Sequence, residues 1–432
     1  MSNNKEYWYT PPENFGTYPE IQKQKKLPQQ EKRKKLAHGS RWKIILIIVV
    51  VVIVLCASIG GLVYFFLNNS SGVPKYTVNL EKGTGIVSVK GNGRYEEGEI
   101  VTVTATSASG YDFNDWISSN TSLVPNSSNE RYTFEMPVGD ITLTANAEKS
   151  APAIAEGECG EKVYWKLDQN GILKITGTGP MKDYPSRISS NHWRSLKEST
   201  APWCKETWDE DRLSKVEKIK ISDGITHIGD WAFTNCYNAT EITIPQTVTS
   251  IGDYALMGCK KLKNIQIPDS VNDMGIGALA NCYALTEINL PKDLTTISGA
   301  LFSNCDKLTN VEWPNHITAI EDEAFSDCHN LTNITIPEGV NTIGNSAFEH
   351  CIRLTTIILP STITSIGNNC FLSCANIKEI HIPSSVTSMG NAVFEYWDSS
   401  HTIYIEGKSS APPSWDEAWL SGAWGVNVVW DA

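Results

Sequence analysis

Histidines and catalytic motifs are scarce in this sequence. Only 8 histidines occur among 432 residues. They are scattered, without the HExxH spacing of zinc peptidases, and the GxSxG turn of serine hydrolases and a Walker-type phosphate loop are absent as well. We therefore expect the protein not to be an enzyme, and we expect no catalytic residues, no cofactor and no metal site.

Basic residues are also scarce over most of the chain. Residues 1–43 carry ten Lys or Arg and four Glu, a net charge of +6. Because the whole chain has a net charge of −12, the remainder carries −18. Such an acidic surface repels the phosphates of a nucleic acid, so we expect no nucleic-acid partner.

One stretch lacks charge altogether. Residues 44–67 read IILIIVVVVIVLCASIGGLVYFFL, which is 24 residues and long enough to cross the roughly 30 Å hydrocarbon core as a helix. A cleaved signal peptide would have a shorter apolar run and a shorter leader. We expect a single-pass signal anchor at 42–67, with a disordered cytoplasmic tail at 1–41 and the C-terminal repeats extracellular.

Cysteine is plentiful, but its spacing excludes a metal centre. Seven of the 11 cysteines recur every 23 residues from Cys236 to Cys374, and a proline recurs with the same period from Pro245 to Pro383. Structural zinc ligands lie two to four residues apart, whereas a period of 20 to 50 residues indicates stacked units of a solenoid. We interpret residues 216–400 as eight repeats with a ladder of small, buried cysteines.

The copy from Thr332 to Leu354, TNITIPEGVNTIGNSAFEHCIRL, predicts how one repeat folds. Ile334 and Ile336 alternate with polar residues, as in a half-buried strand, so stacked copies should form a parallel sheet. The later apolar cluster fits a short helical or 3₁₀ turn. A glycine usually follows the isoleucine of the T-I-G phrase, but Ser298 and Glu321 replace it, which argues against a strict need for positive φ there.

The consensus I-x-I-P-x-x-V-x-x-I-G-x-x-A-F-x-x-C-x-x-L resembles the BspA-type, or treponemal, leucine-rich repeat over about 185 residues. The resemblance implies a curved solenoid on a bacterial cell surface that binds a protein or other macromolecule in adhesion or host contact. The alternative is a structural or sensory envelope protein that couples an external contact to a cytoplasmic partner. Neither the ligand nor the oligomeric state follows from the sequence.

A small β domain precedes the repeats, between linkers at 68–75 and 149–157. Residues 76–148 alternate in the manner of five or six strands, and we expect Trp116 and Phe113 to fill the core. The phrases GEIVTVTATSASGYDFNDW and YTFEMPVGDITLTANA resemble the divergent internalin-type B-repeat, which implies a β-grasp-like spacer.

Each end of the solenoid would leave an unpaired sheet edge exposed, so we expect a capping segment at both ends. Residues 158–215 should form the N-terminal cap, with a hairpin that turns at Asn170 and Gly171; Cys159 and Cys204 in this region could pair in an oxidising compartment. Residues 401–432 should form the C-terminal cap. The candidates to close its core are Trp415, Trp419 and Trp424. The expected fold is thus mainly β, with a capped eight-repeat solenoid, a small β domain and one transmembrane helix.

The outward strand positions form the candidate binding face. Stacking arranges them in two rows with about 4.8 Å per step, on a face that solenoid curvature makes concave. A face that is merely solvated would show the same variation. The first row is Lys218, Glu241, Asn264, Glu287, Asn310, Asn333, Thr356 and Glu379, and the second is Lys220, Thr243, Gln266, Asn289, Glu312, Thr335, Ile358 and His381. We call these two rows the sheet face.

Overall fold

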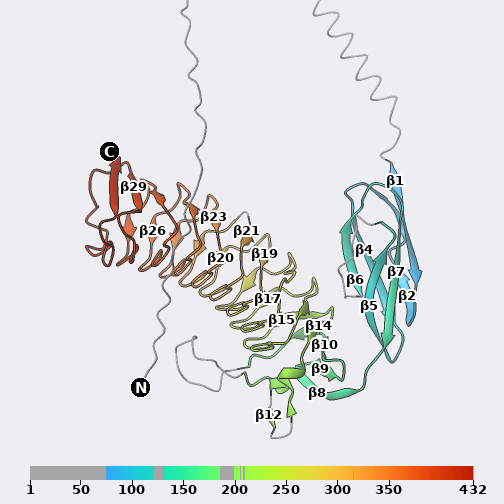
Figure 1. Ribbon diagram of the computed structural model, residues 1–432. Coiled ribbons are helices and arrows are strands. Elements are labelled where there is room, and N and C mark those ends of the chain that lie inside the picture. Colours follow the sequence, from blue (N-terminus) through green and yellow to red (C-terminus); the bar gives the residue numbers. More distant parts are fainter. Residues whose placement is uncertain are drawn as a thin grey trace, which may run out of the picture. The chain divides into compact units, whose positions relative to one another are not determined.

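The computed structural model describes residues 74–120, 130–184, 199–204, 206–207, 210–314 and 316–431 (Figure 1). The expected cytoplasmic tail and the expected anchor at 42–67 lie outside these residues. Among the described residues, no helix is long and apolar enough to span a bilayer. The helices there are two short 3₁₀ turns, η1 (Pro202–Cys204) and η2 (Leu213–Lys215), so the described fold is mainly β, as predicted.

The small β domain contains seven described strands rather than five or six. They form two sheets, of which one has the order β3-β1-β7-β5 and the other β2-β4-β6. Burial alternates along β7, which places every second residue in the core. Trp116 and Phe113 are buried with ring centroids 5.9 Å apart, as expected. The strands are β1 (Lys75–Lys82), β2 (Ile86–Lys90), β3 (Gly93–Glu96), β4 (Ile100–Ser107), β5 (Tyr111–Ser118), β6 (Arg131–Glu135) and β7 (Ile141–Lys149).

Seven of the eight repeats contribute one strand each to a series of parallel strands, which we call the first ladder. Its register follows the 23-residue period, as in the pairs Lys218↔Glu241 and Asn333↔Thr356. The third repeat contributes only a bridge, from Gln266 to Asn289. The strands are β14 (Lys218–Ile221), β16 (Glu241–Thr243), β19 (Glu287–Asn289), β21 (Asn310–Glu312), β23 (Asn333–Thr335), β25 (Thr356–Ile358) and β27 (Glu379–Ile382).

A second parallel ladder of short strands follows the prolines. It runs as β15-β17-β18 and then as β20-β22-β24-β26-β28, and within the described residues no strand pairing joins β18 to β20. The strands are β15 (Ile225–Ile228), β17 (Ser250–Ile251), β18 (Asp273–Met274), β20 (Thr296–Ile297), β22 (Ala319–Ile320), β24 (Thr342–Ile343), β26 (Ser365–Ile366) and β28 (Ser388–Met389).

The apolar cluster that closes each repeat is a stacked turn, so the predicted helical turn is wrong. Two positions per repeat adopt left-handed backbone, for example Ser346 (φ 52°) and His350 (φ 57°). The Cys351 amide donates within the turn to the Phe348 oxygen at 3.2 Å, whereas the Phe348 amide donates to Cys370 in the next repeat at 3.0 Å. Alternate amides therefore join neighbouring repeats, which a helix would not allow.

The N-terminal cap extends the solenoid backwards. Its predicted hairpin is present, since β9 (Val163–Asp168) pairs antiparallel with β10 (Ile172–Gly177). In addition, β10 pairs parallel with β14, so the cap supplies an extra turn of the first ladder. The outer strand β8 (Ala153–Gly160) completes the sheet. The remaining short strands are β11 (Gly179–Pro180), which joins the second ladder, β12 (Glu206–Thr207) and β13 (Glu210–Asp211).

The C-terminal cap also continues the first ladder. β29 (Thr402–Glu406) and β30 (Asn427–Asp431) pair parallel beyond β27, which carries the sheet past the eight repeats. Trp415 and Trp419 are buried as predicted. Trp424 is 68 % exposed, so its predicted place in the core is wrong; the buried Trp397 lies there instead, edge-on to Phe394 with ring centroids 4.8 Å apart.

The repeat cysteines are buried in the same core as the phenylalanines of the repeats, and none of the described cysteines forms a disulfide. Consecutive rings such as Phe325 and Phe348 stack at 5.3 Å. Each thiol from Cys259 onward is also a hydrogen-bond donor to a carbonyl of the preceding repeat. Cys159 and Cys204 are thiols, so the pairing considered from the sequence does not occur here.

Candidate binding surfaces

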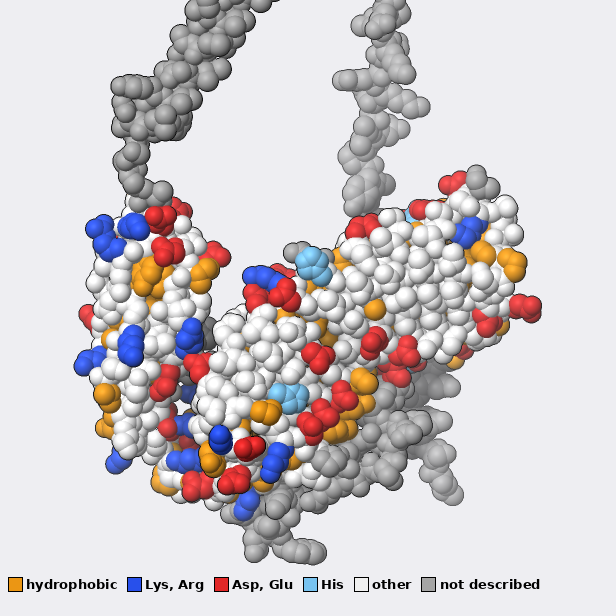
Figure 2. Space-filling view, turned by 180° about the vertical axis from the view of Figure 1, so that it is seen from behind, with side chains coloured by type: hydrophobic (Ala, Val, Ile, Leu, Met, Phe, Trp, Pro, Cys, Tyr) orange, Lys and Arg blue, Asp and Glu red, His pale blue; other side chains and the backbone are white. Residues whose placement is uncertain are grey.

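The structure brings the predicted sheet-face residues together in two parallel rows. Register pairs such as Asn289↔Glu312 and Thr335↔Ile358 run along the second row. From Asn264 onward every member of both rows is exposed, while the alternate residues point into the core. Their role in binding stays a prediction, because the geometry alone fixes only their position. Figure 2 shows groups of acidic side chains spread along the repeats, in keeping with the negative charge.

The basic end of the sheet face makes contacts within the chain. Lys218 Nζ lies 2.9 Å from Glu241 Oε2, and Lys220 Nζ donates to the Phe113 carbonyl oxygen of the β domain at 3.2 Å. Burial lowers the pKa of Lys220. These lysines are therefore less available to an external ligand than the rest of the face.

The opposite end of the second row is apolar and aromatic. Ile358 is 53 % exposed, and the imidazole of His381 stacks on the ring of Tyr404 at 4.6 Å. The register continues from His381 to Tyr404 and on to Val429, which is 42 % exposed. We call Ile358, His381, Tyr404 and Val429 the C-terminal stripe.

Tyr404 and Val429 were missed from the sequence because residues beyond 400 were assigned to a cap. For Tyr404 a signal exists, since it follows His381 by one period in the alternating phrase TIYIE. Val429 lies outside the 23-residue register and has no such signal. The stripe therefore combines repeat and cap residues.

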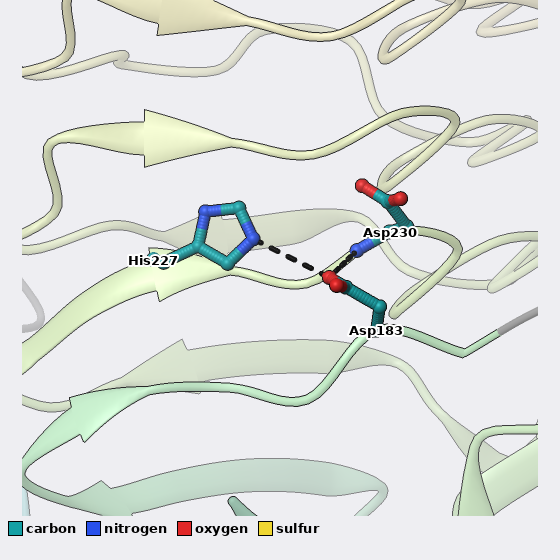
Figure 3. Close-up of side chains that lie close together, drawn as sticks. All are labelled: Asp183, His227 and Asp230. Carbon is teal, nitrogen blue, oxygen red and sulfur yellow. Dashed lines mark hydrogen bonds and ion pairs between the residues drawn. The ribbon is translucent and has the colours of Figure 1, made fainter.

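One cluster has the composition of a metal site, namely Asp183, His227 and Asp230 (Figure 3). Asp183 Oδ1 accepts the Asp230 backbone amide at 3.0 Å and lies 3.5 Å from His227 Nε2. The Asp230 carboxylate points away from Asp183 in Figure 3 and accepts the Asp253 amide at 2.8 Å. Burial raises the pKa of Asp230, which disfavours the charged form that a metal needs.

The same cluster fits the repeat architecture better than a cation. His227 Nδ1 lies 2.7 Å from Ser250 Oγ, so each of the three side chains already has a polar partner. The Asp183 carboxylate accepts the Asp230 backbone amide of the first repeat, just as the Asp230 carboxylate accepts the Asp253 backbone amide of the second. We assign the cluster to inter-repeat hydrogen bonding.

Two parallel ladders around one continuous core of 23-residue turns define a leucine-rich-repeat solenoid. Residues 211–328 and 299–411 match the BspA type Leucine rich repeat region, in 6 copies, and residues 76–151 match the Divergent InlB B-repeat domain. The chain thus contains a BspA-type repeat region preceded by a divergent B-repeat, as the resemblances predicted. The matched repeat family is one of surface proteins rather than of known enzymes.

Similar solved structures are bacterial leucine-rich-repeat proteins. One from Bacteroides ovatus is 22 % identical, with 62 % of this chain and 76 % of that chain covered and a TM-score of 0.46. A leucine-rich cell surface protein from Faecalibacterium prausnitzii is 20 % identical, with 65 % and 95 % covered and a TM-score of 0.30. The pneumococcal vaccine antigen PcpA is 15 % identical, with 65 % and 89 % covered and a TM-score of 0.33. No curated protein matches the chain.

Proposed function

We propose that the chain is a membrane-anchored bacterial surface protein whose solenoid binds a protein or other macromolecule outside the cell. The repeat family supports a role in protein binding or adhesion. The uncharged run at 44–67, preceded by a segment with a net charge of +6, supports the anchor and its orientation. The sheet face, and above all its C-terminal stripe, is the proposed contact surface.

The C-terminal stripe, in which Ile358, His381 and Val429 are exposed and Tyr404 is half-buried, is the observation that carries this proposal. The outward isoleucine and the tyrosine stacked on an outward histidine support the sheet itself, and they also give its surface the aromatic and apolar character of the anchors that supply most of the energy in protein interfaces. Parallel pairing fixes the backbone of β27 and β29 in register, so little ordering is required when a partner binds.

Site-specific photo-cross-linking tests the contact surface without knowledge of the ligand. Benzoylphenylalanine is placed at Thr335, next to Ile358 in the register, in cells that display the full chain. The matched control carries it at Lys261, which is exposed on a turn between repeats. We expect a discrete covalent adduct from position 335 and none from position 261.

The triple substitution Ile358→Ser, His381→Gln and Tyr404→Ser should remove that adduct. Ile358 and His381 are exposed, and substitutions at such positions usually shift stability by about 0.5 kcal/mol or less. Tyr404 is half-buried and stacks on His381, so the triple variant should lose about 1–2 kcal/mol in total and remain folded. Adducts from position 261 alone, or an adduct at 335 that survives the triple substitution in a stably folded variant, would place the contact elsewhere.

A further inference from the structure

The turn after each second-ladder strand normally carries a glycine followed by Asp or Asn. The side-chain oxygen of this residue accepts the backbone amide of its equivalent in the next repeat, at 2.7 Å from Asn345 to Asp322 and 2.8 Å from Asn368 to Asn345. The glycine before it lies so close to the preceding repeat that a side chain would collide. We call this series of Asp and Asn residues the Asx column.

The pattern is lost in three consecutive repeats and retained in the other five. The three pairs read Gly275-Ile276, Ser298-Gly299 and Glu321-Asp322. The missing strand pairing between β18 and β20 falls in the same place. The Gly299 amide cannot donate to the preceding repeat in the usual way, because Ile276 stands there in place of an Asp or Asn. This amide donates instead to Glu321 Oε2 of the next repeat at 2.9 Å. Random drift would scatter such losses along the array, whereas these are adjacent.

A pocket of about 620 Å³ opens at this break. Gly299 supplies no side chain where the column would place an Asp or Asn, which leaves space between Ile276 and Asp322. Ile276, which is 43 % exposed, lines the pocket together with Ala300 and Ile343, and the exposed residues Glu321 and Asp322 add carboxylates to the lining. Among the described residues, no Lys or Arg lies within ion-pair distance of these two carboxylates.

We propose that this pocket binds an arginine side chain presented by a protein partner. The aliphatic stem of arginine packs on apolar surface while its head stays charged, which matches a lining that combines Ile276 with two carboxylates. A planar guanidinium also presents several N–H donors to carboxylates at once. Glu321 Oε2 accepts the Gly299 amide, whereas Asp322 accepts the Asn345 backbone amide through Oδ1 and the Asn345 side-chain amide through Oδ2. A carboxylate oxygen has two lone pairs and accepts further donors. The site lies on the second ladder, so it is distinct from the sheet face.

Methyl NMR of the full chain in detergent tests this site directly. Isoleucine δ1 methyl groups are labelled, and the Ile276 signal is assigned with Ile276→Val. The probe is the peptide acetyl-Gly-Arg-Gly-amide, and the matched neutral probe has citrulline in place of arginine. We expect saturable shifts of the Ile276 signal with the arginine peptide, weakened by added salt, and much smaller shifts with the citrulline peptide.

Three variants decide which groups bind. Glu321→Gln with Asp322→Asn keeps one side-chain oxygen for each of the two backbone amides but removes both charges, and should raise the dissociation constant by roughly tenfold or more. Glu287→Gln with Glu312→Gln makes the same charge change on the sheet face and should leave binding intact. Gly299→Asn restores the Asx column and fills the pocket, so it should abolish binding while the unfolding midpoint stays equal or rises.

The inference is overturned by equal shifts with the two peptides, by unchanged affinity in the Glu321 and Asp322 double variant, or by an Ile276 signal that does not respond. Each variant is first checked for an unfolding midpoint that is not lowered, so that lost binding is not mistaken for lost structure. Binding that is removed by the sheet-face double variant instead would also refute the assignment.

Discussion

The indole N–H of Trp397 donates a hydrogen bond to the carbonyl oxygen of Phe371 at 3.0 Å. One repeat earlier, the thiol of Cys374 donates to the carbonyl oxygen of Phe348 at 3.1 Å. Trp397 occupies the cysteine position of the last repeat, and it retains the bond although its size and shape differ entirely. This position therefore favours a side chain that is largely apolar and also carries a hydrogen-bond donor. The interpretation of these cysteines as small hydrophobes was incomplete.

A first prediction compares two substitutions at Cys305, whose thiol lies 3.2 Å from the Leu279 oxygen. Cys305→Ala should lower the free energy of unfolding by about 1–2 kcal/mol, because it leaves a small cavity and removes the donor. Cys305→Ser should cost less than alanine, since its hydroxyl can donate to the same oxygen. Denaturant unfolding in reducing buffer measures both. A serine variant clearly less stable than the alanine variant would mean that the site is purely apolar.

A second prediction concerns alkaline pH. Burial raises the pKa of Cys282 to about 12, so the folded state favours the protonated thiol. The resulting stabilisation is complete below roughly pH 8.5, the pKa of a solvated thiol, and is lost as the pH rises towards 12. The urea midpoint should therefore fall above about pH 8.5, and less steeply in Cys282→Ala. Equal slopes in the two proteins would show that this thiol does not contribute.

The 23-residue period was enough to predict the solenoid, the two outward rows and the inward positions. It could not predict the left-handed positions, because Trp231, Tyr254 and Glu323 occupy one of them and none is a residue that prefers positive φ. Hydrogen bonds between repeats impose that backbone. The pocket could not be predicted either. In the sequence, a change such as Gly299 in place of Asp or Asn looks like ordinary variation, and its effect appears only when the Asx column is known from the structure.

A third prediction tests the proposed topology. The basic segment at 1–43 precedes the uncharged run, and basic flanks are retained on the cytoplasmic side. Protease added to intact cells or spheroplasts should digest the repeats and spare an epitope fused within residues 1–40. Lysed cells serve as the control, since there both parts should be cut. Loss of the tail epitope in intact cells, with the repeats preserved, would reverse the orientation.

The last prediction uses two glycines of the second-ladder turns, Gly344 and Gly299. A Cβ at Gly344 would lie 2.5 Å from the Asp322 nitrogen and 2.6 Å from the Glu321 carbonyl carbon, both backbone atoms. Neither glycine has positive φ, so the requirement at Gly344 is close approach between repeats. This supports the expectation that positive φ is not needed there. Gly299 is different, since its nearest obstacle would be the Asp322 oxygen at 3.3 Å.

Gly344→Ala should therefore lower the free energy of unfolding by about 2–3 kcal/mol, because two backbone segments must separate, whereas Gly299→Ala should change it by about 0.5 kcal/mol or less. The two variants add the same methyl group to turns two repeats apart, one at the glycine position of the turn and one at the position after it, so the loss of freedom in the unfolded state is alike for both. The difference between the two variants in the free energy of unfolding, measured by equilibrium denaturation, therefore reports the cost of the steric clash at Gly344. Similar losses in both would mean that the array adjusts its spacing freely, and the glycine in the consensus would then need another explanation.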